Sequence, residues 1–210
     1  MTEPPPIFTL IACPMIGQLG PDSRIIERDP CPTCNQPYPE EVEFLDYELD
    51  TWERAELIKA ARDNYAITQR LFSVMQQAGL QGLAAQDMQV SRSEVFAAND
   101  PENKVVIPEF RRLLLLERAD GPSGWWERGP QCPTCQRIVW RATDRVTQAL
   151  FAKYGNKPGP PRQVSAATWH GWDAFYLSDP GPPVVTERFK RVAEEQKVEG
   201  LVLAPAEWVP

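Results

Sequence analysis

Two identical tetrapeptides, Cys31-Pro32-Thr33-Cys34 and Cys132-Pro133-Thr134-Cys135, contain four of the five cysteines of this chain. A CxxC turn brings both of its sulfurs to one side, so two such turns, here called knuckles, supply the four thiolates of a closed tetrahedral zinc site. The sequence therefore predicts a structural Zn²⁺ held by Cys31, Cys34, Cys132 and Cys135. Such an ion would join two segments that lie far apart in the sequence.

Two other uses of the knuckles remain open. Disulfides would suit a secreted protein. The segment Leu10-Ile11-Ala12-Cys13 faintly resembles a lipoprotein cleavage box, but it lacks a preceding basic region and follows Glu3 and three prolines, so we do not expect export. No apolar run approaches the roughly 20 residues that cross a bilayer. Redox chemistry needs an activated thiolate at a helix N-terminus, whereas both knuckles follow proline-containing loop sequences. We expect a cytoplasmic protein with reduced cysteines, no membrane contact, and Cys13 as a small buried residue.

Charge restricts the kinds of partner. The 210 residues carry a formal net charge of −7, which argues against a nucleic-acid phosphate backbone as the main ligand. Acidic side chains gather between residues 40 and 50, and this stretch either faces a basic partner or forms an ordinary soluble edge. A Trp pair in a glycine-rich loop either anchors an interface or packs beside the second knuckle. The candidate partner-binding residues are Glu43, Asp46, Glu48, Trp125 and Trp126.

Apolar periodicity predicts an α+β fold. The predicted strands span residues 7–13, 42–49, 84–90, 105–108, 112–117, 138–140, 172–176 and 201–203. The predicted helices span residues 52–64, 67–80, 144–154 and 183–196, with a turn over 99–103, a loop over 120–130 and a proline-rich linker over 157–162. Thr68 and Thr186 are expected to cap two of these helices at their N-termini, and Gly79 or Gly82 to end the first.

Two stretches of the chain resemble each other. The segment Ile67-Thr68-Gln69-Arg70-Leu71 matches Val185-Thr186-Glu187-Arg188-Phe189, and Gly82-Leu83 matches Gly200-Leu201 at the same offset. We expect two related helix–strand modules joined by the four-cysteine zinc-knuckle site; the alternative is chance similarity between two amphipathic helices. The expected organisation is an N-terminal module over 1–98, the second knuckle with linking strands over 99–156, and a C-terminal module over 157–210, within one compact unit.

Catalytic motifs are absent from the sequence. Its single histidine, His170, lies between two tryptophans, a setting more typical of packing than of proton transfer. If four thiolates fill the zinc shell, no coordination position remains for a reactive water molecule. We therefore expect that the protein is not an enzyme.

The two CPxC knuckles, with Asp173-x-Phe175, the segment Val184–Phe189 and Glu199-Gly200-Leu201, resemble the bacterial double-CXXCG motif immunity proteins, best known in myxobacteria. The resemblance covers most of the chain, although Asn35 and Gln136 stand where that family has glycine. It implies a cytoplasmic antitoxin that binds and neutralises a cognate toxin, encoded adjacently, by occlusion.

A zinc-ribbon protein that binds nucleic acid or assists transcription is the alternative function. Arg111, Arg112, Arg137 and Arg141 are available for this role, but the excess of acidic residues opposes it.

Overall fold

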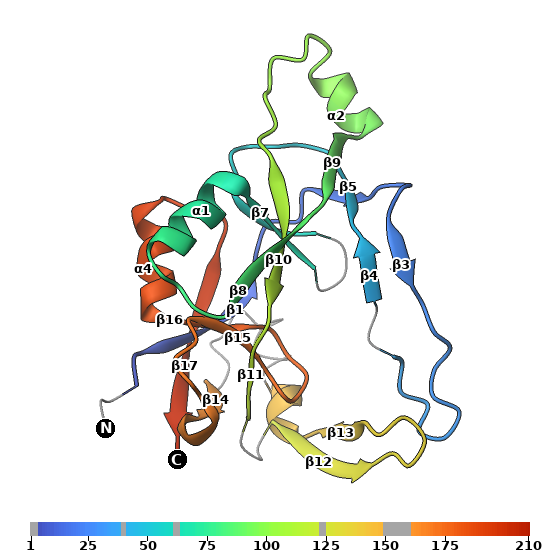
Figure 1. Cartoon of the computed structure of the whole chain (residues 1–210), viewed down its shortest axis with the longest axis vertical. Coiled ribbons are helices and arrows are strands. Elements are labelled where there is room, and N and C mark those ends of the chain that lie inside the picture. Colours follow the sequence, from blue (N-terminus) through green and yellow to red (C-terminus); the bar gives the residue numbers. More distant parts are fainter. Residues whose placement is uncertain (1–3, 39–40, 61–63, 122–124, 149–160) are drawn as a thin grey trace.

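The computed structural model describes residues 4–38, 41–60, 64–121, 125–148 and 161–210, and it has an α+β fold (Figure 1). Its helices are Gln69–Gln77 (α1), Glu94–Asn99 (α2) and Glu187–Glu195 (α4), with residues 144–148 also helical and a 3-10 turn at Ala166–Thr168. Its first ten strands are Ile7–Ala12 (β1), Gly17–Leu19 (β2), Arg24–Ile26 (β3), Glu41–Phe44 (β4), Asp46–Leu49 (β5), Leu57–Lys59 (β6), Tyr65–Thr68 (β7), Leu83–Asp87 (β8), Gln89–Arg92 (β9) and Phe110–Leu115 (β10). The others are Arg118–Ala119 (β11), Trp126–Gln131 (β12), Ile138–Ala142 (β13), Arg162–Ser165 (β14), Ala174–Leu177 (β15), Val184–Thr186 (β16) and Val202–Val209 (β17).

Two sheets form the body of the molecule. One has the strand order β11-β15-β16-β1-β17-β14 and the other β6-β7-β10-β8. The N-terminal strand β1 lies between β16 and β17 from the end of the chain, antiparallel to both. In the other sheet, β10 lies between β7 and β8 in the same antiparallel manner. The two sheets therefore share one pairing scheme, β15-β16-β1-β17 in one and β6-β7-β10-β8 in the other.

The register of pairing also recurs. In the four-stranded sheet, Ile67 of β7 pairs with Leu57 of β6 and with Arg111 of β10. In the six-stranded sheet, Val185 of β16 holds the equivalent position and pairs with Ala174 of β15 and with Phe8 of β1. Across the central strands, Arg111 pairs with Asp87 as Phe8 pairs with Pro205. In a separate three-stranded sheet, β2-β5-β9, β9 pairs in parallel with β5. Within the six-stranded sheet, the last residues of β17 pair in parallel with β14 in the same way.

Helices α1 and α4 begin in the same way. Each N-cap threonine, Thr68 or Thr186, accepts a hydrogen bond from the backbone N–H three residues later. The threonine hydroxyl itself donates to an acidic side chain just before the neighbouring strand, to Glu56 at 3.0 Å and to Asp173 at 2.7 Å. This capping stabilises the first helical turn, typically by about 1 kcal/mol. The N-caps predicted from sequence are confirmed, and left-handed Gly79 follows the end of α1 as expected.

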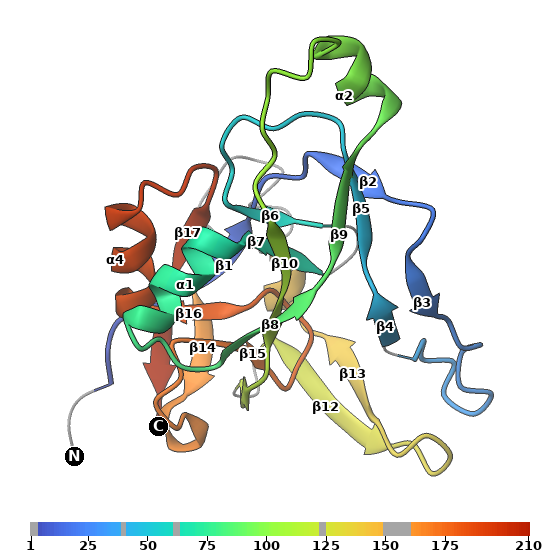
Figure 2. The ribbon, with the colours of Figure 1, turned by 45° about the horizontal axis from the view of Figure 1, so that its top comes forward.

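Apolar side chains form three clusters. The largest joins α1 and α4, which lie side by side in Figure 2, with β7, β10, β16 and β1. The second lies around Leu45, Tyr47 and Ile58, and the third around Phe175, Leu177 and Val184. None of these clusters includes a knuckle cysteine. Among the described helices, none combines the length and apolarity needed to span a membrane.

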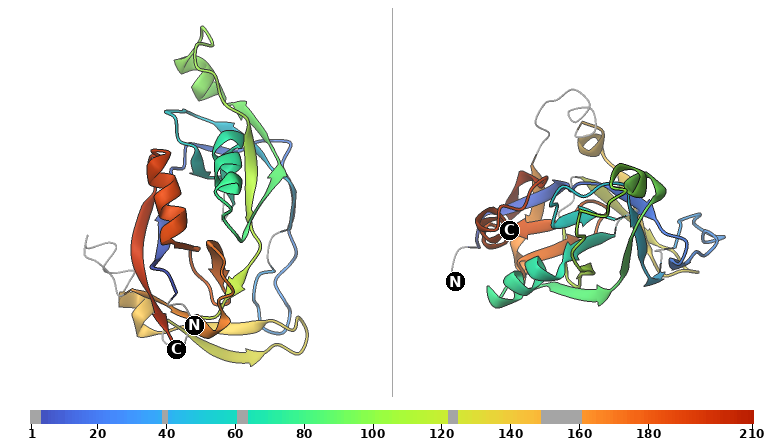
Figure 3. Two further views of the ribbon diagram at one scale, coloured as in Figure 1. Left: turned by 60° about the vertical axis from the view of Figure 1, so that its left-hand side comes forward. Right: turned by 90° about the horizontal axis from the view of Figure 1, so that it is seen from above.

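Three parts extend from this body (Figures 1 and 3). The β3–β4 ribbon, here called arm 1, reaches toward the first knuckle, and the β12–β13 ribbon, arm 2, toward the second. Residues 93–109, here called the finger, contain α2 and project from the opposite end of the molecule. Ser93 caps α2 by accepting from the Phe96 N–H, and Arg92 pairs with Asp100 at 2.8 Å, so the finger is held by its own contacts.

The structure corrects several predicted elements. Residues 52–64 are not a helix: within the described part, they contain β6, whose Leu57 and Ile58 are both fully buried. Residues 105–108 form no strand, and the predicted loop over 120–130 contains all but the last residue of β12. The helix predicted over 144–154 is seen for residues 144–148, and the remainder lies outside the described residues, as does most of the predicted linker. The strands predicted over 42–49 and 84–90 are each interrupted, so that they form β4 with β5 and β8 with β9. The helix predicted over 183–196 begins only at Glu187, because Val184–Thr186 form β16. The remaining predicted strands occur with shifted ends.

Candidate metal centre

The two knuckles have the same local structure. In the first, the Cys31 N–H donates to the Gln36 carbonyl at 3.0 Å, and the Asn35 N–H donates to the Cys31 carbonyl at 2.8 Å. In the second, the Cys132 N–H donates to the Arg137 carbonyl at 2.8 Å, and the Gln136 N–H donates to the Cys132 carbonyl at 2.9 Å. Asn35 and Gln136 both have left-handed backbones, with φ of 54° and 58°. Both knuckles thus form the same turn although neither has glycine at this position.

The four sulfurs converge at one point. Cys31 Sγ lies 3.7 Å from Cys132 Sγ, Cys34 Sγ lies 3.7 Å from Cys135 Sγ, and all four lie within 4.8 Å of one another. A tetrahedral ion with metal–sulfur bonds of about 2.3 Å separates its sulfurs by about 3.8 Å, whereas a disulfide bond is about 2.05 Å long. The cysteines are free thiols here, and their spacing fits a metal ion.

Contacts around the sulfurs also join the two arms. The Thr33 and Thr134 hydroxyls hydrogen-bond each other at 2.6 Å, so equivalent residues of the two knuckles meet. Arg137, from the second knuckle, donates to the Gln36 carbonyl at 2.9 Å and to the Pro37 carbonyl, and its guanidinium lies 4.4 Å from the centre of the Tyr38 ring. These contacts are polar and largely at the surface, so a metal ion would be the principal bond between the arms.

The thiols differ in acidity. Backbone N–H groups of Cys34 and Thr33 lower the pKa of the Cys31 thiol to about 6, and the Arg137 N–H lowers the pKa of Cys135. At Cys34, the Gln36 N–H favours the thiolate, but burial and the neighbouring sulfurs outweigh it and raise the pKa to about 11. Crowded thiolates repel one another, and a divalent cation removes this penalty by allowing all four to ionise.

The predicted acidic face is only partly exposed. Glu43 is exposed, and Glu48 is half-buried and accepts a hydrogen bond from Gln18 at 3.3 Å. Asp46 is buried, so its inclusion among exposed partner-binding residues was wrong. Its carboxylate accepts from the Asp22 N–H at 3.2 Å and thereby holds the turn before β3. Sequence alternation could not reveal this, because β4 ends and β5 begins at this point.

The two tryptophans are half-buried rather than displayed on an exposed loop. The Arg162 guanidinium lies 5.1 Å from the centre of the Trp125 ring, and Arg162 forms a buried ion pair with Asp179. Trp126 is the first residue of β12 and pairs with Ala142. Trp125 thus packs against a buried charge pair near the base of arm 2. This ion pair could not be predicted from the sequence, because Arg162 and Asp179 stand in proline-rich stretches without periodicity.

Most of the arginines considered for nucleic-acid binding have partners within the chain. Arg111 pairs with Asp87 at 2.6 Å, Arg112 donates to the Val42 carbonyl at 2.7 Å, and Arg137 binds the first knuckle as described above. Arg141 is exposed. His170 is exposed and lies edge-on to Trp172, with 5.2 Å between ring centres.

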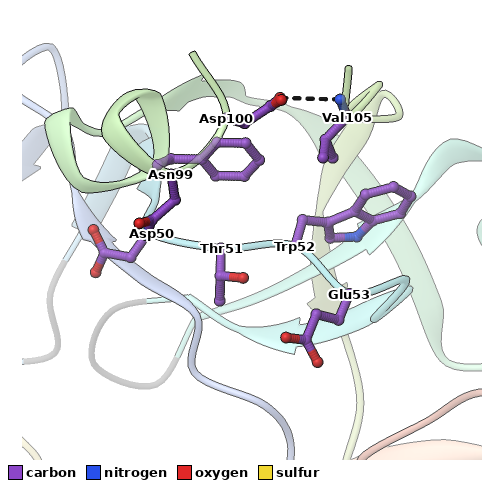
Figure 4. A pocket seen from close by; sticks show the side chains of 8 residues that line it. Asp50, Thr51, Trp52, Glu53, Asn99, Asp100 and Val105 are labelled. Atoms are coloured by element: carbon purple, nitrogen blue, oxygen red, sulfur yellow. Dashed lines mark hydrogen bonds between the residues drawn. The ribbon is translucent and has the colours of Figure 1, made fainter. Parts of the chain in front are cut away.

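A pocket of about 240 Å³ lies where the finger meets the body (Figure 4). Its lining includes the carboxylates of Asp50, Glu53 and Asp100. Two of these support the finger: Asp50 accepts from the Ser93 hydroxyl at 2.7 Å, and Asp100 accepts from the Lys104 and Val105 N–H groups at 2.9 and 3.0 Å. The Asp50–Ser93 bond joins the finger to the body, and the Asp100 bonds hold the finger's own turn.

Metal content provides a direct test of the sulfur cluster. Native mass spectrometry is expected to give the chain mass plus one metal ion, and denaturation in acid is expected to release the ion and leave the chain with five free thiols. Acid should release the metal because protons compete for the thiolates. A mass two or four units below that of the reduced chain, without metal, would instead indicate disulfides.

No protein-family model and no curated protein matches this sequence.

Proposed function

We propose that this chain is an immunity protein that binds and neutralises a cognate bacterial toxin by occlusion, with a structural zinc ion at Cys31, Cys34, Cys132 and Cys135. The observation that carries the proposal is the closed sulfur cluster. Four sulfurs at tetrahedral spacing, with Cys31 and Cys132 buried, would fill the coordination shell of zinc. Such an ion contributes to folding, and function then depends on the protein surface.

The net charge and the resemblance to double-CXXCG immunity proteins support the same proposal. Zinc is the metal that a four-thiolate tetrahedral site favours. An acidic, preorganised surface accelerates association with a basic protein and aligns it during encounter. In this mechanism, the zinc-linked arms hold the surface in one conformation, and the toxin loses access to its substrate when its active site is covered.

Co-expression tests this function. Bacteria that produce the toxin-like protein encoded beside this gene are expected to survive when this chain is present and to die when it is absent. The purified proteins are expected to elute as a complex. Survival without complex formation, or complex formation without survival, would contradict neutralisation by occlusion.

The acidic face can be tested separately. We expect Glu43→Lys with Glu48→Lys to lower the affinity for that toxin by on the order of tenfold at low salt, mainly through slower association. Asp46 is left unchanged because it is buried. Glu195→Lys with Glu199→Lys is the matched control, since both residues are exposed near the end of α4 and the overall charge changes equally. Equal affinities for the two variants, measured by stopped-flow and calorimetry, would place the interface elsewhere.

A further inference from the structure

The recurring pairing scheme extends to reciprocal contacts between the two halves. Arg70 in α1 donates to the side chain of Gln196, the C-cap of α4, at 2.8 Å. Arg188 in α4 donates to the carbonyl of Ala78, the C-cap of α1. Arg70 corresponds to Arg188, and Ala78 to Gln196, at the same offset that relates Thr68 to Thr186. Reciprocal contacts of this kind are the mark of a two-fold interface, in which residue i meets j and j meets i.

The same relation holds at the other end of the molecule. Cys31 meets Cys132, Cys34 meets Cys135, and Thr33 meets Thr134, so each knuckle residue contacts its own counterpart. Only residues close to a two-fold axis contact their own equivalents. One axis can therefore run between α1 and α4 and pass through the centre of the sulfur cluster.

The helix-capping contacts follow this symmetry too. The Thr68 N–H donates to the Glu56 carbonyl at 2.8 Å, and the Thr186 N–H donates to the Asp173 carbonyl at 2.9 Å. Arg70 also pairs with Glu56, and Arg188 pairs with Asp173 at 3.4 Å. Chance similarity between two amphipathic helices would not reproduce the strand order, the register and these side-chain contacts together.

We infer that the chain consists of two copies of one unit of about 90 to 100 residues, residues 7–92 and 110–209, joined as an internal strand-exchanged dimer with the metal site on its two-fold axis. The first strand of each copy completes the sheet of the other. β1 belongs to the first copy but lies between β16 and β17, and β10 belongs to the second copy but lies between β7 and β8. The partner that each half is built to bind is therefore a second copy of itself, and this inference does not rest on the proposed function.

Strand exchange and metal sharing give the dimer two distinct links. Each exchanged strand is central in its sheet, so neither copy can complete its sheet alone. Each copy also supplies only two of the four sulfurs. Together with the shared apolar cluster between α1 and α4, this makes each half incomplete without the other.

Disulfide trapping in the full-length, metal-loaded protein tests the exchange. Thr9→Cys with Ala204→Cys, in a Cys13→Ala background, joins register partners on β1 and β17, whose spacing suits a disulfide. Thr9 tolerates this change because its buried hydroxyl has no hydrogen-bond partner. A protease site placed in the exposed turn over 101–104 then separates the two copies after folding and oxidation. The two fragments are expected to stay linked in non-reducing denaturing gels.

The matched control is Thr9→Cys with Gln86→Cys. Gln86 holds the place in the first copy that Ala204 holds in the second, and it pairs with Arg112 on β10. This pair is expected to give two separate fragments with unlinked cysteines. A second linked pair, Leu114→Cys with Ala84→Cys on β10 and β8, is expected to join the fragments as well. Linkage of Thr9 to Gln86, or separation of the fragments in both test pairs, would overturn strand exchange.

Discussion

Replacing Cys31 and Cys132 together with serine is expected to abolish tight metal binding and to release the two arms from each other while the body stays folded. Loss of two of four thiolates should weaken zinc affinity by on the order of 10³-fold or more. The body should persist because the apolar clusters contain no knuckle cysteine, and because α1 and α4 pack on each other far from the sulfurs. Chelation of the metal from the unsubstituted chain should have the same effect.

Hydrogen exchange distinguishes this local release from global unfolding. Amides of Asn35 and Gln136, which close the knuckle turns, should lose protection. Amides of α1 and β7 should keep the protection that they have in the metal-loaded chain. Cys13→Ser is the matched control, since Cys13 lies outside the sulfur cluster. Simultaneous loss of protection in the knuckles and in α1 would contradict a locally acting metal.

Replacing Asp179 with alanine is expected to destabilise the protein by about 3–5 kcal/mol, because it leaves the buried Arg162 charge without its counter-ion. Both side chains are almost fully buried, at 6% and 2% exposed. Burial raises the pKa of Asp179 above its usual value, and the neighbouring Arg162 opposes this shift. The pair is therefore costly to break although it contributes little net stability while intact.

Denaturant unfolding of three variants tests this reasoning. Asp179→Ala alone should show the large loss of unfolding free energy. Arg162→Met with Asp179→Leu should lose much less, because removing both charges leaves neither uncompensated. Asp120→Ala is the control, since Asp120 is exposed and accepts from the Ser178 hydroxyl at 2.6 Å. Equal losses for the single and the double variant would show that packing, rather than charge, sets the cost.

Local features of the fold could be predicted from the sequence because their causes are local. The two CxxC motifs predicted that the sulfurs of each knuckle lie on one side of its turn. Thr68 and Thr186 predicted where two helices begin, because their hydroxyls can accept a hydrogen bond from the first helical turn. The helix predicted over 52–64 failed because β6 is covered on both faces. Leu57 packs in the cluster between α1 and α4, and Ile58 packs in the second cluster. Consecutive buried residues fit a helical period as well as a strand buried on both sides.

Long-range features could not be predicted in this way. Nothing within Ile7–Ala12 indicates that its partners are the last strands of the chain, since any apolar strand would fit a central position in either sheet. The burial of Asp46 depends on a turn more than 20 positions earlier in the sequence. The similarity of residues 67–83 to 185–201 predicted related modules, but the exchange of β1 and β10 is a property of pairing between the halves.

The finger has a consequence for stoichiometry. A molecule built from two like halves offers most of its surface features twice. A ligand that recognises one such feature therefore finds two equivalent binding sites, and two ligand molecules can bind one chain. Residues 93–109 connect the halves and occur once, with Val95 and Val106 exposed at 56% and 79%. A ligand that touches this segment meets a single copy of it, and its complex with the chain is then one to one in a single orientation.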